Sequence, residues 1–565
     1  MGAALLAIAS LCCASMIAAY EISTHAGMTN ATYGKSILSA SSTYDRLGLT
    51  TLAQRNLKNT YLDLADALPN PILVRPRSGL PFESDIWPAS IVMPDAQLFG
   101  VRGWLMRGAV REDDTSSAIS FGRSGSPRDD PDGNINRFCN HFFDPVNVRA
   151  LSTFCFNSTL DMSPNWAIGT TDAFANPVQR QSLYRNHYTI FGAREAMWRA
   201  LTLKDVFGGN IALGTNAVER EAERLAYWAT TFRSVGDVVH LIQDMAQPQH
   251  TRNEDHGTGR NAIYEAYADA RAGGPRAQPA RTFVVDASTL SAVEGTLRPL
   301  DYELRDQNGA LVPYPIPRFN NYTDYWTTAR GAAGVPRPQS ITAGLGLADY
   351  SSRGFLTLGT SLNGATFSEF SSPPRLSSDP TYAETPSVDL CDSASGANIK
   401  AKYLLRDVVD LTVPTTTQNI KLQSRSAWNN SIGTTFYTMN HCVMDDHLRL
   451  LIPRAVAYSA GLIDYFFRGQ LEIRLPNEGV YAILDHSVPG DNCKDTCGFK
   501  KIKLKLANAT PDITPSGGGA VAVQTMTGGT LVAVAKYHKN TCYTTDLEGE
   551  YDSGTLINGS TETVL

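Results

Sequence analysis

The stretch "NAVEREAERLAYWATTFRSVGDVVHLIQDMAQPQH" (216–250) combines a helical pattern with ionisable residues where a buried face is expected. Its apolar residues recur at three- and four-residue intervals, the period of a helix packed on one side. Pro248 closes the pattern, because proline cannot continue a helix. His240 and Asp244 are spaced i, i+4 and therefore lie on one helix face, within reach of one ion. Buried ionisable groups are costly unless they are paired or bind metal.

Further potential ligands follow within a short distance along the chain. His250 and His256 come after the proline, and Glu265 lies in the next helical pattern, "NAIYEAYADARA" (261–272). Mixed imidazole and carboxylate ligands suit zinc. The structural alternative is a core histidine with a buried ion-pair partner, and spacing alone does not decide between the two.

The rest of the chain predicts a mainly α protein with a small β domain at its end. Helical periodicity continues in "REAMWRALTLKDVF" (194–207) and "HLRLLIPRAVAYSAGLIDYFFRG" (447–469). We therefore expect a helical domain over 20–470, with a Pro-, Gly- and Ser-rich insertion around 273–440. From about 478 the period changes to two, in "KIKLKLA" and "TLVAVAKYH", which predicts a β domain over 478–565.

Composition and the N-terminal segment indicate an exported globular protein. The 565 residues carry a net charge of −6, which gives no electrostatic case for binding long polyanions, and we expect no stable nucleic-acid partner. The apolar run at 3–19 is short for a transmembrane helix and predicts a signal peptide over 1–19, and hence a secreted, periplasmic or cell-surface location. Export permits disulfide bonds, and a Cys139–Cys155 bridge is one pairing that would clamp the intervening segment.

The His-x3-Asp-x5-His pattern of His240, Asp244 and His250, with Pro248 inside it, resembles the zinc-dependent phospholipase C family. That family shares its fold with the single-strand-specific zinc nucleases. The resemblance implies a multi-helix domain that holds three zinc ions in a cleft and hydrolyses phosphoesters.

Three other segments are similar to family segments, in the same order. "NHFFDP" (140–145) implies that His141 is a ligand, and "EISTHAGMT" (21–29) implies the same for His25. "GAVREDD" (108–114) resembles an acidic segment and implies a ligand at Asp113. The rivals for that acid are Asp114, Asp129 and Asp130.

The resemblance also departs from the family at two points. Family members use the first residue of the mature chain as a zinc ligand. Cleavage after residue 19 would make this residue Tyr20, whereas the family typically has Trp there. The phospholipases place a Glu four residues after their last histidine, but residue 260 here is Arg. Glu265 is the substitute that we select, and Glu254 and Asp255 are its rivals.

The resemblance implies a complete set of three zinc sites. The first ion would be held by Tyr20, His25 and Asp244, the second by Asp113, His141, His240 and Asp244, and the third by His250, His256 and Glu265. The zinc ions would activate a water as hydroxide for attack on phosphorus, with Asp244 shared between two ions and Asp113 accepting the water's proton.

The sequence leaves the substrate open. The acidic net charge favours a phospholipid or another phosphodiester over a nucleic acid, and a lipid substrate implies peripheral contact with a membrane surface. The alternatives are a single-strand nuclease or nucleotidase of the same superfamily, and a non-catalytic secreted surface protein with a degenerate zinc site. Oligomeric state and head-group preference do not follow from the sequence.

Overall fold

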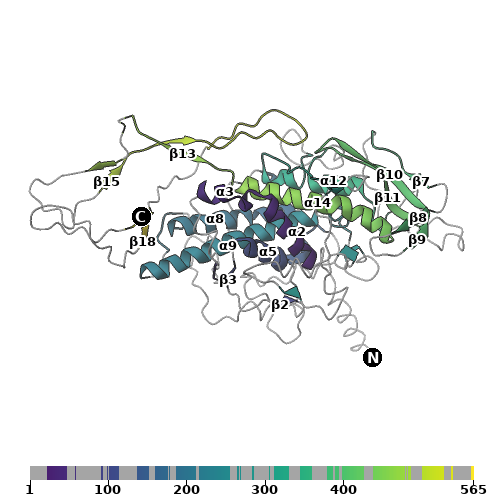
Figure 1. The fold of residues 1–565 in the computed structure, drawn as a ribbon, viewed down its shortest axis with the longest axis horizontal. Coiled ribbons are helices and arrows are strands. Elements are labelled where there is room, and N and C mark those ends of the chain that lie inside the picture. The colour runs from purple at the N-terminus through teal and green to yellow at the C-terminus, as the bar shows by residue number, and fades with distance from the viewer. Residues whose placement is uncertain are drawn as a thin grey trace, which may run out of the picture.

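A long helix surrounded by shorter helices forms the centre of the molecule (Figure 1). The computed structural model describes residues 22–46, 101–112, 137–151, 160–175, 188–205, 207–211, 215–254, 311–329, 344–358, 378–385, 398–425, 437–477 and 499–526, with short pieces between them. The α-helices are α2 (Ile22–Lys35), α3 (Ser41–Arg46), α5 (Val101–Glu112), α7 (Ser163–Ile168), α8 (Ile190–Thr202), α9 (Ala217–Asp244), α12 (Leu347–Gly354) and α14 (His441–Phe466). Short 3-10 turns include η2 (Ile37–Ser39), η4 (Arg137–Asn140) and η6 (His250–Arg252).

The central helix α9 is buried on all sides over its C-terminal half. Helices α2, α5, α8 and α14 all pack against it. Every residue from 227 to 250 is buried, although many of them are polar, such as Asp237 and Gln243. Buried polar groups need partners, so this half of the helix must carry either a hydrogen-bond network or a binding site.

Side-chain caps fix where the main helices start. Asn216, Thr189 and Asn440 each accept a hydrogen bond from the backbone N–H three residues ahead, at the first turns of α9, α8 and α14 respectively. These residue types are the preferred N-caps, because their oxygens satisfy N–H groups that lack helical partners. Helix α9 ends at Asp244, and a turn at 245–249 leads to η6. The helix therefore ends before Pro248.

Two glycines allow α5 and α9 to touch through their backbones. A Cβ on Gly236 would overlap the carbonyl oxygen of Leu105, and a Cβ on Gly108 would overlap that of Arg233. The crossing places the second half of α5 beside the C-terminal half of α9, where His240 lies.

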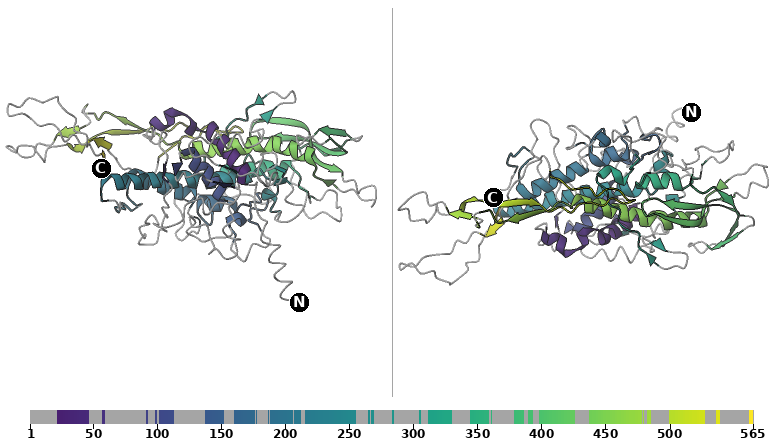
Figure 2. Two further views of the ribbon diagram at one scale, coloured as in Figure 1. Left: turned by 60° about the horizontal axis from the view of Figure 1, so that its bottom comes forward. Right: turned by 90° about the horizontal axis from the view of Figure 1, so that it is seen from above.

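Helix α14 supports the N-terminal helix α2. Thr32 of α2 donates a hydrogen bond to the carbonyl of Val456 (3.4 Å). Just beyond α2, the backbone N–H of Ile37 donates to the carboxylate of Asp464 (2.7 Å). The two segments are more than 400 residues apart in sequence but lie side by side, as the views in Figure 2 also show.

A four-stranded antiparallel sheet lies at one end of α14, in the order β12-β11-β10-β7. Its strands are β7 (Ala383–Glu384), β10 (Tyr403–Asp410), β11 (Thr415–Arg425) and β12 (Tyr437–Thr438). Strand β10 alternates buried and half-buried residues along "LLRDVVD", and it packs against α12. Part of the Pro-, Gly- and Ser-rich segment around 273–440 therefore forms regular strands.

The C-terminal region consists of two-stranded ribbons in the part that the structure describes. β13 (Leu471–Arg474) pairs with β16 (Lys505–Asn508), β14 (Ala482–Leu484) with β15 (Phe499–Ile502), and β17 (Lys536–His538) with β18 (Glu562–Val564). The predicted strand "KIKLKLA" is divided between β15 and β16, which pair with different partners. The remaining described strands are the short β1 (Leu57–Lys58), β2 (Ile91–Val92), β3 (Leu98–Phe99), β4 (Phe283–Val284), β5 (Leu304–Arg305), β6 (Leu311–Val312), β8 (Asp389–Asp392) and β9 (Asn398–Ala401).

The observed fold is mixed, with a mostly helical N-terminal part and small antiparallel sheet regions toward the C-terminus. Cys139 and Cys442 are both in disulfide bonds. The predicted partner Cys155 lies outside the described residues, so the Cys139–Cys155 pairing stays a prediction. None of the described helices is both long and apolar enough to span a bilayer.

His447 on α14 should make the protein sensitive to acid. The ring is fully buried, edge-on to Phe355 with the ring centroids 5.0 Å apart, and burial lowers its pKa from 6.5 to about 3. Between these two pH values the unfolded chain binds a proton that the folded chain does not. The free energy of unfolding therefore falls by up to ~1.4 kcal/mol for each pH unit below 6.5.

We expect the free energy of unfolding of His447→Leu to fall less than that of the wild type between pH 7 and pH 5, as measured by urea denaturation. Equal losses would contradict this role of His447.

Candidate metal centre

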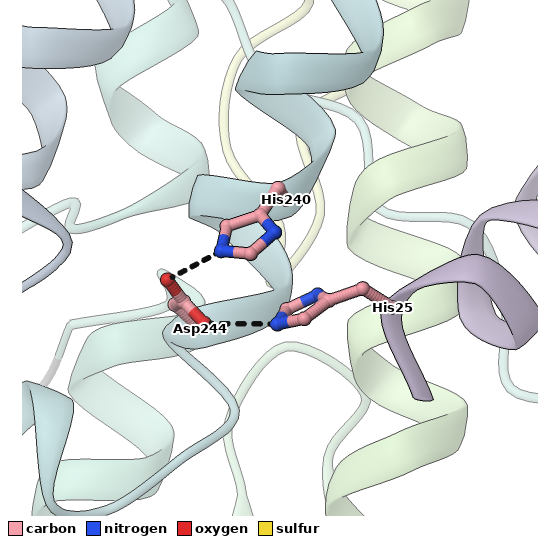
Figure 3. A group of neighbouring side chains, drawn as sticks. All are labelled: His25, His240 and Asp244. Atoms are coloured by element: carbon pink, nitrogen blue, oxygen red, sulfur yellow. Dashed lines mark ion pairs between the residues drawn. The ribbon is translucent and has the colours of Figure 1, made fainter. Parts of the chain in front are cut away.

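His25, His240 and Asp244 come together in the core, where α2 meets the C-terminal end of α9 (Figure 3). All three side chains are fully buried. Nε2 of His25 lies 3.3 Å from one oxygen of Asp244, and Nε2 of His240 lies 3.3 Å from the other. One ligand atom from each residue lies within 4.8 Å of the other two, so this group could hold a metal ion.

Hydrogen bonds on the far side of both rings leave each Nε2 facing the carboxylate. Nδ1 of His240 donates to the carbonyl oxygen of Ala109 (2.6 Å), and Nδ1 of His25 donates to Oε1 of Gln243 (2.7 Å). In the neutral form of either ring, Nε2 would present its lone pair toward Asp244. The two rings stack with centroids 3.7 Å apart. Two imidazole nitrogens and a carboxylate that converge in a buried site could hold a metal ion.

Two more histidines face the same carboxylate. Nδ1 of His141 lies 3.0 Å from Asp244 Oδ2 and 3.3 Å from Nε2 of His240. Nδ1 of His250 lies 3.6 Å from Asp244 Oδ2, and its ring stacks on Phe142 with centroids 4.3 Å apart. Four histidines from three separate segments of the chain thus surround one acid.

The charges of the site's own groups shift the pKa values of His141 and Asp244 in opposite directions. Burial lowers the pKa of His141, but the charges of Asp244 and Glu112 outweigh it and raise the value to about 10. Burial raises the pKa of Asp244, but the positive charges of the surrounding histidines hold it well below its usual range. At neutral pH the proton on His141 therefore balances the carboxylate. A metal ion bound here would displace that proton, as metal binding to imidazole generally does.

Glu112, at the end of α5, is an acid of the site that the sequence reasoning missed. Its Oε1 lies 3.6 Å from Nε2 of His141 and accepts a hydrogen bond from the indole of Trp166 (2.6 Å). Arg137 forms an ion pair with Oε2 and also contacts Asp237 (2.9 Å). Burial raises the pKa of Glu112, but the positive charge of Arg137 helps to lower it by more than burial raises it. The side chain is therefore ionised. Glu112 is a neighbour of the predicted Asp113, which lies outside the described residues, as do its rivals Asp114, Asp129 and Asp130.

The third predicted ligand group is described only in part. Glu265 is buried and accepts a hydrogen bond from Nε2 of Gln247 (2.7 Å), in the turn between α9 and η6. Its rival Glu254 is also buried and pairs with Arg252 (2.6 Å). His256, the rival acid Asp255 and the predicted terminal ligand Tyr20 lie outside the described residues.

No protein-family profile, curated protein or solved structure matches the chain.

The donor set fits a zinc ion better than a hard cation. Imidazole nitrogens and one or two carboxylates suit Zn²⁺, whereas Mg²⁺ and Ca²⁺ prefer sites made only of oxygen ligands. Backbone or amide acceptors hold Nδ1 of His25 and His240, as outer-shell partners of zinc-bound histidines do.

Proposed function

We propose that this protein is a secreted zinc-dependent phosphodiester hydrolase that resembles phospholipase C. The observation that carries the proposal is the convergence of His25, His141, His240 and His250 on the buried carboxylate of Asp244. Each of these five residues stands in a segment that resembles the zinc-dependent phospholipase C family, and the segments occur in the family's order.

We assign three zinc ions to the residues in and around this centre. Asp244 serves two ions, with His25 and Tyr20 at the first and with His141 and His240 at the second. The 3.6 Å approach of Glu112 to His141 supports Glu112 as an alternative to Asp113 for the acid of the second site. His250, His256 and Glu265 complete the third.

The residues of this chain would prepare the site for hydrolysis. Zinc bound here would lower the pKa of a water toward neutrality and stabilise negative charge on a phosphate. Asp244 balances the positive charge of the centre, and the buried α5–α9 contact excludes bulk water. Asp113, the acid that the resemblance implies, would accept the proton of the attacking water.

A phospholipid is the substrate class that we favour. The net charge of −6 gives no general attraction for a polyanion. Trp166, an aromatic side chain that could have stacked on an unpaired base, is fully buried and bonded to Glu112. A lipid substrate would bring the protein into peripheral contact with a membrane. A single-strand nuclease or nucleotidase is the alternative, and a non-catalytic surface protein is the third possibility.

Metal content and three substrates test this proposal together. We expect close to three zinc per chain by elemental mass spectrometry of protein purified without chelator. Hydrolysis of a choline phospholipid should be lost on chelation and return with added zinc, while single-stranded DNA stays intact. Cleavage of DNA in place of lipid would favour the nuclease. One zinc or none after reconstitution, with no hydrolysis of a chromogenic phosphodiester, would leave the surface-protein reading.

A further inference from the structure

A glutamine links helix α2 to the candidate metal centre. Gln243 precedes Asp244 on α9 and is fully buried. Its Oε1 accepts a hydrogen bond from Nδ1 of His25 (2.7 Å), and its Nε2 donates to the hydroxyl of Thr29 (3.0 Å). His25 and Thr29 are one helical turn apart on α2, so a single amide spans two neighbouring side chains on one helix face.

The amide of a glutamine has two orientations, and they have opposite effects on the histidine. With the oxygen toward Nδ1, as observed, Nδ1 keeps the ring proton and Nε2 presents a lone pair to Asp244. With the amide reversed, the NH₂ group would donate to Nδ1, and the ring proton would move to Nε2. His25 would then donate a hydrogen bond to Asp244 and could not bind a metal through that nitrogen. In the observed orientation the NH₂ group also has a partner, the hydroxyl of Thr29.

We propose that Gln243 is a positioning residue that selects the metal-binding tautomer of His25. The inference rests on the proposed function in one respect, that the centre binds zinc. Outer-shell partners of metal-bound histidines contribute about 10- to 100-fold to metal affinity. An amide partner also leaves the net charge of the site unchanged, which a carboxylate partner would not.

Two variants separate the acceptor role of Gln243 from its role in packing. Gln243→Leu keeps much of the volume and removes the acceptor, whereas Gln243→Glu keeps an acceptor and cannot present a donor when ionised. Zinc affinity is measured by competition with a chromophoric chelator. The tautomer of His25 is read in the zinc-free protein from its ¹⁵N chemical shifts.

We expect the wild type to carry its His25 proton on Nδ1. Gln243→Leu should bind zinc about 10- to 100-fold more weakly, and Gln243→Glu should bind at least as tightly as the wild type. The matched control is Gln423→Leu, which changes another fully buried glutamine, one that donates to the carbonyl of Thr357. This control should lower the melting temperature without changing the zinc affinity. Equal zinc affinity in Gln243→Leu and the wild type, or weak binding by Gln243→Glu, would overturn the inference.

Thr29→Val provides an independent test if the Gln243 variants do not fold. It removes one of the two hydrogen bonds that position the amide and keeps the shape of the side chain. We expect a zinc affinity between those of Gln243→Leu and the wild type. An unchanged zinc affinity in Thr29→Val would contradict the inference. If the wild type itself binds no zinc, the proposed function fails, while the ¹⁵N measurement still decides which tautomer Gln243 selects.

Discussion

Replacing Asp244 with Asn should abolish zinc binding and hydrolysis while the chain stays folded. Asparagine has the shape of aspartate, but it carries no charge to balance a cation and offers a single acceptor oxygen. Four histidine nitrogens lie 3.0–3.6 Å from the Asp244 carboxylate, so the whole centre depends on it. Loss of an outer-shell partner costs about 10- to 100-fold in affinity or activity, and loss of this acid should cost more than 100-fold. Zinc content and phosphodiester turnover measure the effect.

Asp237 provides a matched control on the same helix. It is fully buried, and burial raises its pKa well above its usual range, with the negative charge of Glu112 adding to the effect. Asparagine keeps the shape of the side chain and an oxygen that can accept a hydrogen bond from Arg137. We expect Asp237→Asn to keep its zinc and most of its turnover. Zinc retained by Asp244→Asn at the wild-type level would refute the assignment of Asp244 as the shared ligand.

Gly236→Ala should destabilise the protein by about 2–4 kcal/mol and weaken zinc binding as well. The added Cβ would overlap the carbonyl oxygen of Leu105, a backbone atom that moves only if α5 and α9 separate. Separation would stretch the bond between Nδ1 of His240 and the carbonyl of Ala109, which fixes the tautomer of that histidine. Urea denaturation of the zinc-free protein and chelator competition measure the two effects separately.

Gly34→Ala is the control for this substitution. Gly34 lies in helix α2, and a Cβ there would meet no atom within 4 Å. Alanine favours a helix over glycine, so this variant should gain about 0.5–1 kcal/mol. If Gly236→Ala proved as stable as Gly34→Ala, the backbone contact between α5 and α9 would be wrong.

The sequence predicted the helices better than it predicted the partners of the site. The three- and four-residue spacing predicted a helix through His240 and Asp244, and α9 has both on one face. It could not show that α9 is buried on every side after 227, because a periodic pattern predicts one apolar face. In the sequence, the sign that this half of the helix does more than bury one apolar face was its group of polar residues, which includes Gln243.

Two omissions have identifiable physical causes. Glu112 stands beside Asp113 in a run of three acids, and the sequence alone does not show that this last residue of α5 lies 3.6 Å from His141. Strand β10 alternates in burial, but its sequence "LLRDVVD" does not alternate apolar with polar residues, because Arg406 and Asp410 lie on the buried side. It also lies in a Pro- and Gly-rich context that favours irregular structure. Its antiparallel partner β11 contains a run of threonines with no such alternation.

The contact of α2 with α14 has a consequence for how the protein matures. His25 belongs to one of the first helices to be synthesised, but the atoms that support its helix come from Val456 and Asp464. The ribosome must therefore complete most of the chain before the centre can assemble. Any ion that bound at this centre would therefore be acquired late, in the compartment in which the finished chain folds.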